Sequence, residues 1–450
     1  MTRVKKQAPQ ASRNRIWLDL EVEVYYQRIA NDFSELSFED LEQEAFRCVA
    51  EQERYLDEEC LQLNAASSLP NPKVAKMLAS SLGNRPSLGH PGQKYNKGME
   101  ASERLEVMLS ELLKRLFRVR YVETRVPSGT IANLYSYMAT TKPGDRIMAF
   151  SDRFAGHVTH HSAGAAGLYG LEVHEVPCDP ERMDVDVAAL RSKAQQLKPK
   201  LIIVAGSMCL FPYSVAEVRK VADEIGAWVL YDAAHMGGMI AGGAFQQPLE
   251  EGAHLMTGST YKSFGGPPSG IVLTNEPTLA ERLDRIAFPG MTANFDLSRT
   301  AAMIIATLDL LEYGETYAQQ CIANAQALAE ALQAEGLPVF RVPEKGFTNS
   351  QHVAIEAHSF GGGDAASIQL QLANVITCGI GLPRDPVEGD VNGIRLGTPE
   401  ITRRGMTSKH MPAMASFFRR VLLDQEVKDS VRADVLAFRQ QFSGMHFVRN

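Results

Sequence analysis

Short apolar segments with the character of β-strands alternate with helical segments through the middle of this chain. From about Pro72 onward, the expected strands are residues 146–150, 201–205, 228–231, 254–256 and 270–274. Residues 187–197 and 215–225 lie between these strands and have the apolar spacing of amphipathic helices. The alternation predicts a large α/β domain, residues 71–298, in which helices cover a mainly parallel sheet. Such sheets bind ligands at the carboxyl ends of their strands.

The pattern changes after about residue 298. A long helical stretch, residues 298–333, ends near Gly336 and is followed by shorter strands and two helices. The expected strands are residues 352–355, 375–378 and 394–396. These elements predict a smaller C-terminal α+β domain, residues 299–450. Within it, three glycines precede a helix, and we expect Asp364 to cap the N-terminus of that helix.

The N-terminal part of the chain has helical periodicity and many charges over residues 37–60. Leu41, Phe46, Val49 and Leu56 form an apolar stripe that is available for burial. We therefore predict an N-terminal arm, residues 1–70, that packs on another element such as a second subunit. The opening is basic but has no apolar run, with Arg3, Lys5, Lys6, Arg13 and Arg15. A frayed, solvated terminus is favoured there over a transit sequence.

The bulk composition excludes several classes of function. Apolar residues make up 45% of the 450 residues and charged residues 22%, as in ordinary globular proteins. The net charge of −7 argues against nucleic acid or an anionic membrane surface as a main partner. No stretch has the apolar length of a membrane span. The six cysteines are scattered without a CxxC pair, which favours reduced thiols and a cytoplasmic protein.

Two segments thirty residues apart carry the strongest chemical signal. Lys262 lies between hydroxyl residues and a glycine pair, in a setting that allows a Schiff base with an aldehyde. Asp232 closes an apolar strand and begins an Asp-Ala-Ala-His block that ends at His235. A carboxylate there can keep a pyridinium nitrogen protonated, although it can also cap a helix. The pair predicts pyridoxal 5′-phosphate, with His235 near the phenolate oxygen of its ring or the substrate.

Ser128, Gly129 and Thr130 precede a helical run, residues 131–138. They supply a glycine, two hydroxyls and free amides at a helix N-terminus, which suits a phosphate group. An ordinary helix cap is the alternative for an isolated motif of this kind. Because Lys262 and Asp232 further along the chain predict pyridoxal phosphate, we interpret residues 128–130 as the site that binds its phosphate group.

Three histidines follow the expected strand at residues 146–150. We expect His157 to stack on the cofactor ring or to transfer protons. His160 and His161 are equally well explained as polar loop residues. No carboxylate or cysteine lies at a ligand-like spacing from the three, so we expect no metal site.

Arg395 lies in a short strand between Gly393 and Gly397. A buried strand is an unusual place for a solvated charge, and a bidentate clamp on a substrate carboxylate explains it. We expect the nearby Arg403 and Arg404 to lie at the surface.

Taken together, these motifs resemble the serine hydroxymethyltransferase family of fold-type I pyridoxal phosphate enzymes, which have an aspartate aminotransferase-like large domain. The resemblance covers about residues 60–440, and its motifs occur in the order of the family. They are residues 89–95, 128–133, 232–235, 288–290 and 393–405, the last being the most specific.

The resemblance implies roles for individual residues. Lys262 would form the Schiff base, Asp232 would contact the pyridine nitrogen, His157 would stack on the ring, and Arg395 would bind the substrate carboxylate. The remaining cofactor contacts would come from Ser128, Gly129, Ser207, His235 and Gly290. In this family the glycine at the Gly290 position belongs to the partner subunit. A homodimer with shared active sites, or a tetramer built from it, is therefore implied.

The chain departs from the family pattern where the family handles folate. Leu88 replaces the carboxylate that works on the folate-bound one-carbon unit. Asp152 replaces a leucine that packs against the pterin, and Ile380 replaces the asparagine that holds the pterin edge. Leucine cannot exchange a proton, isoleucine cannot hydrogen-bond a pteridine, and an unpaired carboxylate against an apolar ring is costly. The tetrahydrofolate apparatus is therefore expected to be largely lost.

Other departures lie close to the expected cofactor site. Pro86 replaces a phosphate-contacting tyrosine, and Tyr95 is followed by Asn96 where the family has a second tyrosine. Tyr261 replaces the histidine before the Schiff-base lysine, and Pro268 replaces an arginine that follows it. With Leu88 unable to act as a base, His157, Tyr95 or a bound water remain for that role.

The resulting hypothesis is aldol cleavage of a β-hydroxy-α-amino acid without tetrahydrofolate. The products would be an aldehyde and glycine, or alanine if an α-methyl group is accommodated. Family relatives that dispense with folate include α-methylserine aldolases. The alternatives are a hydroxymethyltransferase that uses tetrahydrofolate, a CoA-dependent α-oxoamine synthase, and a catalytically silent cofactor-binding scaffold.

Overall fold

The computed structural model describes residues 15–450, so most of the basic opening lies outside the described residues. Contacts divide the chain into two units, residues 1–59 and 60–450. In the first unit, α1 (Leu20–Phe33) is followed by α2 (Phe38–Glu53), which continues into the π-helical turn η1 (Arg54–Glu59). Phe46 and Val49 on α2 are 71% and 56% exposed within this one chain. An arm that packs on another subunit therefore stays a prediction.

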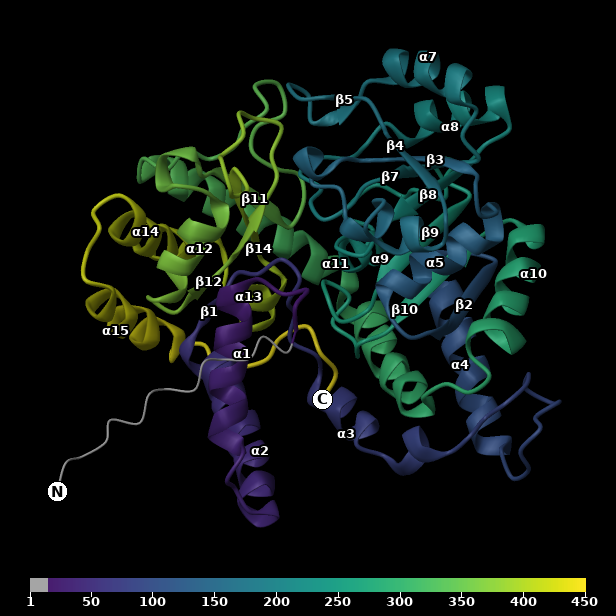
Figure 1. Cartoon of the computed structure of the whole chain (residues 1–450), viewed down its shortest axis with the longest axis horizontal. Helices are drawn as coiled ribbons and strands as arrows, with labels where there is room; N and C mark the ends of the chain where they lie inside the picture. Colours follow the sequence, from purple (N-terminus) through teal and green to yellow (C-terminus); the bar gives the residue numbers. More distant parts are fainter. Residues whose placement is uncertain (1–14) are drawn as a thin grey trace. The chain divides into compact units, whose positions relative to one another are not determined.

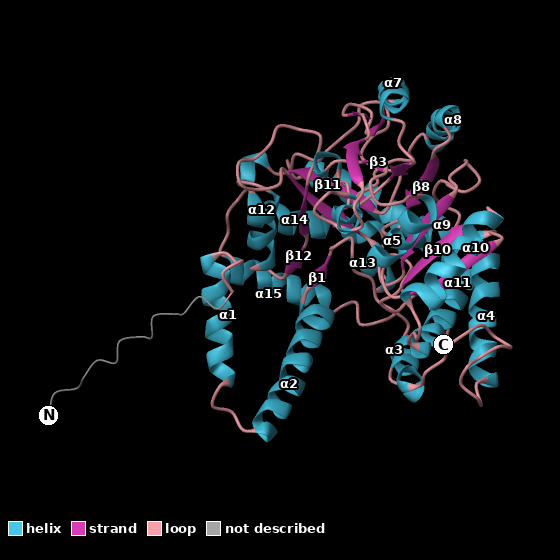
Figure 2. Ribbon diagram, turned by 45° about the vertical axis from the view of Figure 1, so that its right-hand side comes forward, coloured by secondary structure: helices cyan, strands magenta, loops and turns pink. Residues whose placement is uncertain are grey.

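The second unit is built on a seven-stranded sheet (Figures 1 and 2). The strand order is β2-β10-β9-β8-β7-β3-β4, and every neighbouring pair is parallel except those that involve β10. The strands are β2 (Tyr121–Val126), β3 (Arg146–Ala149), β4 (Glu172–Glu175), β7 (Leu201–Val204), β8 (Trp228–Asp232), β9 (Leu255–Ser259) and β10 (Gly270–Thr274). The prediction of an α/β fold with a mainly parallel sheet is confirmed. β2 and β4 at the two edges were not predicted.

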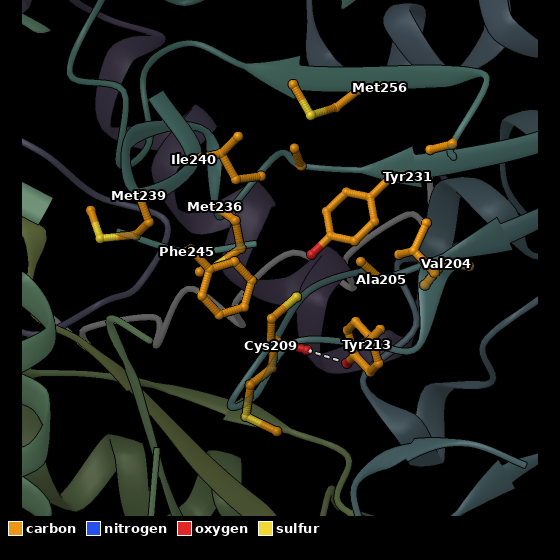
Figure 3. Packing of buried hydrophobic residues seen from close by; sticks show 14 of the residues in the cluster. Val204, Ala205, Cys209, Tyr213, Tyr231, Met236, Met239, Ile240, Phe245 and Met256 are labelled. Carbon is orange, nitrogen blue, oxygen red and sulfur yellow. Dashed lines mark hydrogen bonds between the residues drawn. The ribbon is translucent and has the colours of Figure 1, made fainter. Parts of the chain in front are cut away.

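Alternate side chains of the strands enter two different cores, because successive residues of a strand point to opposite faces. On β8, Val229 and Tyr231 join one apolar cluster, whereas Leu230 joins the other. Figure 3 shows the ring of Tyr231 pointing into the first cluster, toward Met236 and Phe245. Asp232 follows Tyr231, so its side chain lies on the face of Leu230.

Helices cover both faces of this sheet, as a parallel sheet requires. The first cluster is completed by α4 (Glu100–Phe117), α7 (Val187–Leu197), α8 (Val215–Ile225), α9 (Gly237–Ala241) and α11 (Leu297–Ala334). The second is completed by α5 (Gly129–Thr140), α6 (Ala165–Leu168) and α10 (Pro277–Arg285). Shorter elements of this part are α3 (Pro72–Leu78), η2 (Ser81–Asn84), η3 (Asp152–Phe154), η4 (Val158–His160), β5 (Cys178–Asp179), β6 (Asp184–Val185) and η5 (Ile286–Met291).

The 38-residue helix α11 joins this sheet to a second group of elements (Figure 1). Ala302 and Cys321 on α11 belong to the first cluster, whereas Ala325 and Leu332 belong to a third. The third cluster packs on an antiparallel sheet of β11 (His352–Glu356), β14 (Gly393–Gly397) and β13 (Cys378–Ile380). β1 (Leu61–Gln62) pairs with β12 (Val375–Ile376) beside it. The helices here are η6 (His358–Phe360), α12 (Gly363–Gln371), α13 (Pro399–Arg403), η7 (Ser408–His410), α14 (Met411–Leu422) and α15 (Lys428–Arg439).

Contacts place residues 60–450 in one unit, so the division into a large and a small C-terminal domain, with boundaries at residues 70 and 298, stays a prediction. Among residues 15–450, no helix combines the length and the apolar character that crossing a bilayer requires.

The prediction that Asp364 caps α12 is wrong. The helix begins two residues earlier than such a cap implies, at Gly363, and Gly362 occupies the N-cap position with a φ of 122°. The carboxylate of Asp390 instead accepts hydrogen bonds from the amides of Asp364 (3.1 Å) and Ala365 (3.0 Å). A side chain distant in sequence therefore satisfies the free amides of this helix.

The prediction that Arg403 lies at the surface is also wrong. Its side chain is 0% exposed, and its guanidinium lies over the ring of Tyr317, 4.8 Å from the centroid. Nε, Nη1 and Nη2 of Arg403 have no hydrogen-bond partner in the described part of the chain. Arg404 beside it is half-buried.

Candidate active site

The site residues predicted from the sequence follow the ends of neighbouring strands at one edge of the large sheet. β2, β9, β8, β7 and β3 all run in the same direction, because β10 is antiparallel to both β2 and β9. Asp232 is the last residue of β8, and Ser128, Lys262, Ser207 and His157 follow the carboxyl ends of β2, β9, β7 and β3 respectively. The topology therefore brings together residues that are up to 134 positions apart in the sequence. Ligands of parallel sheets bind at this edge.

Lys262 lies in the loop that connects β9 to the antiparallel β10. The loop turns back on itself through hydrogen bonds from Gly265 N to Lys262 O (2.8 Å) and from Gly266 N to Thr260 O (2.7 Å). Lys262 is buried, and its Nζ lies 2.9 Å from Nε2 of His235. Burial lowers the pKa of Lys262 to about 8, with attraction to Asp232 opposing this change. A larger fraction of the amine is therefore uncharged near neutral pH than in an ordinary lysine.

Asp232 closes β8 and is buried. Its Oδ1 accepts a hydrogen bond from the amide of Ala234 (2.9 Å), and its Oδ2 accepts from Asn133 Nδ2 (3.0 Å) and His160 Nε2 (2.8 Å). Burial raises the pKa of Asp232, but the hydrogen bonds from His160 and Ala234, together with the electrostatic effect of His160 and His157, hold it well below its usual range. Asp232 is therefore ionised at neutral pH. It does not cap a helix, because α9 starts only at Gly237.

His157 caps the short helix η4, and its Nδ1 lies 2.8 Å from the hydroxyl of Thr159. Burial lowers the pKa of His157 to about 4, so the ring is neutral at neutral pH. Thr159 in turn accepts a hydrogen bond from Asn133, which also donates to Asp232. The orientation of the His157 ring is thus linked to that of Asp232.

His235 is fully enclosed and lies between two cationic side chains. Its Nε2 is 2.9 Å from Lys262 Nζ and 3.5 Å from Arg395 Nη1. Both neighbours are donors, so Nε2 must be the acceptor and Nδ1 must carry the proton of the neutral ring. Burial, and then the charges of Lys262 and Arg395, lower the pKa of His235 well below its usual value. Its Nδ1 has no partner in the described part of the chain.

Arg395 lies on β14, opposite Cys378 on β13. Its Nη1 donates to the carbonyl oxygen of Ser207 (2.6 Å), and its Nη2 donates to Sγ of Cys378 (3.0 Å). Its Nε is buried and has no partner among the described residues. The guanidinium of Arg395 is thus held by a carbonyl oxygen and a thiol, and its Nε remains as a donor. It is available to bind a carboxylate of a ligand.

Ser128 caps the twelve-residue helix α5, and its hydroxyl accepts a hydrogen bond from the amide of Ile131 (3.3 Å). Gly129 packs closely on Ser259 at the end of β9, since a Cβ at Gly129 would lie 3.1 Å from that of Ser259. Thr130 is exposed at the first turn. This N-terminus therefore lies beside the strand that precedes Lys262, where an anion would meet its free amides.

Tyr95 and Gly290 do not join this group within one chain. Tyr95 is 80% exposed, and Gly290 is exposed in the segment η5. The loops that carry them adjoin each other, because the rings of His90 and Phe288 lie 5.9 Å apart in edge contact. Their contribution to a site thus depends on a second subunit, which stays a prediction.

The sequence pattern missed several residues that the fold places in the site. His160 was interpreted equally well as a polar loop residue, yet it is buried against Asp232. Asn133 and Tyr137 are one helical turn apart on α5 and both point to the same network. Their spacing of four positions in the sequence puts both on one face of a helix, which could have indicated a shared contact. Polar residues on a helix are usually solvated, so this spacing alone did not predict their burial. Among residues 15–450, no group of three or more His, Cys, Asp or Glu side chains is placed to hold a metal ion.

Comparison with known proteins identifies the family of this chain. The family model described as serine hydroxymethyltransferase matches residues 38–418. An alpha-methylserine aldolase from Ralstonia sp is 48% identical over 97% of this chain and 99% of its own length. One from Variovorax paradoxus is 47% identical over 98% of this chain and 99% of its own length. A serine hydroxymethyltransferase from Methanopyrus kandleri is 38% identical over 86% of this chain and 91% of its own length.

The family match spans most of the chain, and these relatives align with nearly all of it. This chain belongs to the serine hydroxymethyltransferase family.

Proposed function

We propose that this chain is a pyridoxal phosphate-dependent aldolase that cleaves β-hydroxy-α-amino acids, α-methylserine among them, without tetrahydrofolate. The observation that carries the proposal is the position of Lys262 Nζ and Arg395 Nη1, both within 3.5 Å of Nε2 of His235. An amine that can hold an aldehyde cofactor thus lies beside a guanidinium that can hold an amino-acid carboxylate. The aldolases from Ralstonia and Variovorax, 48% and 47% identical, support this reaction class.

The residues present fit the cofactor. Asp232 accepts three hydrogen bonds from the protein, and a carboxylate has about four acceptor positions, so one remains for a pyridinium N–H. Lys262 would hold the cofactor through its amine, His157 would pack on the ring, and His235 would lie near the phenolate oxygen. Ser128, Gly129 and Thr130, with Gly290 of a second copy, would bind the phosphate. Ser207 positions Arg395 through its carbonyl oxygen.

Bound pyridoxal phosphate would act as an electron sink for the electron pair left when the Cα–Cβ bond of the substrate breaks. Arg395 would bind the substrate carboxylate and thereby fix the rotation about the Cα–N bond. Asp232, which is ionised, would keep the ring nitrogen protonated. The β-hydroxyl proton must leave to an unprotonated base, and His157 is unprotonated at neutral pH because burial lowers its pKa to about 4. Tyr95 would serve only from a second subunit, since it is exposed within one chain.

The residues that replace the folate apparatus also support the proposal. Leu88 is half-buried, and only its backbone is hydrogen-bonded, to Asn96 and Tyr95. Asp152 is exposed at η3, and its carboxylate accepts a hydrogen bond from the amide of Arg153 (2.8 Å). Ile380 ends the edge strand β13 without a polar group. Leu88 and Ile380 can neither exchange a proton nor hydrogen-bond a pteridine, and a carboxylate at the position of Asp152 is costly against an apolar ring.

The experiment is an aldehyde-release screen of serine, α-methylserine, threonine and phenylserine, each with and without tetrahydrofolate. We expect α-methylserine to yield formaldehyde and alanine in equal amounts, at rates that agree within about twofold with and without tetrahydrofolate. Strong stimulation of serine cleavage by tetrahydrofolate would instead establish a hydroxymethyltransferase. That second candidate is supported by the match to hydroxymethyltransferases such as the one from Methanopyrus kandleri.

A further inference from the structure

A buried chain of hydrogen bonds continues behind Asp232, on the side of α5. Nε2 of His160 lies 2.8 Å from Oδ2 of Asp232, and Nδ1 of His160 lies 2.6 Å from the hydroxyl of Tyr137. That hydroxyl also lies 3.2 Å from the carbonyl oxygen of Thr159. Asp232, His160 and Tyr137 are each at most 2% exposed. The reaction outlined above uses Asp232 but neither His160 nor Tyr137.

The proton positions in this chain follow from the charge of Asp232. An ionised carboxylate only accepts hydrogen bonds, so Nε2 of His160 must carry a proton. Nδ1 then has two possible states. It accepts from the Tyr137 hydroxyl when the imidazole is neutral, or it donates to that oxygen when the imidazole is charged. In the second state the hydroxyl proton turns to the carbonyl oxygen of Thr159.

Both arrangements leave every group in the chain with a partner, as buried polar groups require. The titratable groups that face the imidazole are Asp232 from β8, Tyr137 from α5 and the ring of His157, whose centroid is 6.2 Å away. His160 therefore donates to Asp232 through Nε2, and the Tyr137 hydroxyl holds its other nitrogen.

We propose that His160 and Tyr137 are positioning residues that keep Asp232 ionised and oriented toward the ring nitrogen of the cofactor. The inference rests on the proposed function, because it concerns the same cofactor. Loss of the His160 donor would raise the proton affinity of Asp232. The proton shared by the ring nitrogen and the carboxylate would then move toward the carboxylate, and the ring would become a weaker electron sink.

The test compares His160→Asn and Tyr137→Phe with the wild-type protein, each reconstituted with pyridoxal phosphate labelled with ¹⁵N in the ring. The ring-nitrogen chemical shift reports its protonation independently of turnover. Tyr135→Phe is the matched control. Tyr135 is equally buried on the same helix, but its hydroxyl donates to the carbonyl oxygen of Arg125, outside the Asp232 network.

We expect the ring-nitrogen shift of His160→Asn to move toward the neutral-pyridine value, and that of Tyr137→Phe to move less in the same direction. We expect kcat of His160→Asn to fall about 10- to 100-fold with little change in KM. Tyr135→Phe should match the wild type in both measurements. If His160→Asn does not fold, Tyr137→Phe still decides the question, because it removes one hydroxyl.

A wild-type ring-nitrogen shift in both His160→Asn and Tyr137→Phe would overturn the inference while leaving the proposed function intact. An equal change in Tyr135→Phe would also overturn it, since the effect would then reflect any loss of a buried hydroxyl on α5. If the wild-type protein takes up no cofactor at all, the proposed function itself fails, and the inference fails with it.

Discussion

Arg395 shows how a single residue connects the sequence to substrate binding. Glycines beside an arginine in a strand predicted a carboxylate clamp, and the structure places the guanidinium against Ser207 O and Cys378 Sγ with Nε unpartnered. No carboxylate of the protein is among these contacts. A buried guanidinium left in this state favours an anionic ligand over a structural ion pair.

Arg395→Lys should weaken substrate binding more than it slows turnover. Lysine keeps the charge but loses the planar fork that holds Ser207 and a carboxylate together. We expect kcat/KM for the amino acid to fall about 100-fold, or about 2.7 kcal/mol, mainly through a higher KM. Arg384→Lys is the control, because Arg384 is half-buried and paired with Glu356 in the same small sheet region. An unchanged KM in Arg395→Lys would contradict the assignment.

Buried neutral histidines make the stability of the cofactor-free protein depend on pH. Burial lowers the pKa of His352 to about 3 and that of His157 to about 4, from an ordinary value of 6.5. Above pH 6.5 these rings are neutral in both folded and unfolded chains. As the pH falls below 6.5, the unfolded chain takes up protons that the folded chain does not, so the free energy of unfolding decreases.

We predict that the free energy of unfolding falls by about 2 kcal/mol per such histidine between pH 7 and pH 5. Urea denaturation at the two pH values measures this fall. His352→Gln should make the fall smaller by about that amount, whereas His358→Gln, at an exposed histidine of the same region, should leave it unchanged. An identical fall in His352→Gln and the wild type would show that His352 is not the source.

At the scale of elements, the loop between β9 and β10 packs against the guanidinium of the buried Arg403. Gly265 has a φ of 73°, and a Cβ at this position would lie 2.7 Å from Nη2 of Arg403. Gly243 offers a comparison, with a φ of 68° and nothing within 4 Å of its would-be Cβ. A substitution at either position adds the stability cost of a non-glycine residue in the left-handed region. Only a substitution at Gly265 also displaces a buried guanidinium, so the difference between the two measures that second cost.

Gly243→Ala should cost about 1 kcal/mol of stability, since only the backbone conformation is strained. Gly265→Ala should cost about 2–4 kcal/mol and should also weaken cofactor binding, because the loop that carries Lys262 must move. Thermal or urea denaturation and cofactor titration measure the two effects. Equal costs at both positions would show that Arg403 does not support the loop.

The elements that the sequence predicted well are those with a clear apolar period. Residues 187–197 and 215–225 form helices with those bounds, and Asp232 and Lys262 follow strands that the apolar runs located. β2 and β4 were missed because they are edge strands in which polar residues alternate with few apolar ones. Short edge strands carry little pattern, since only one neighbour and one face constrain them.

The errors at single residues have a common physical cause. Asp364 was expected to cap α12, but Asp390 does so from 26 positions away. Arg403 was expected at the surface, and His160 was not distinguished from a polar loop residue, yet both are buried. Local sequence shows that a polar group is present. Whether the group is buried depends on contacts made by segments distant in the chain.

At the scale of the whole molecule, the exposure of Gly290 and Tyr95 favours an active site completed by a second copy. Mixing two inactive variants tests this. One variant is Lys262→Ala, and the other is Gly290→Trp, which is intended to block the phosphate contact. If sites are shared, a mixed dimer contains one site with both defects and one intact site. Random mixing should then restore about a quarter of wild-type activity. No recovery after verified subunit exchange would contradict shared sites.

At this scale the proposed function depends on Lys262 holding pyridoxal phosphate. Borohydride reduction of the reconstituted protein, followed by peptide mass mapping, tests this most directly. We predict that the reduced cofactor mass is found on the peptide that contains Lys262, and that Lys262→Arg shows no such adduct. A protein that stays colourless after reconstitution, or an adduct on another lysine in the wild type, would contradict the account.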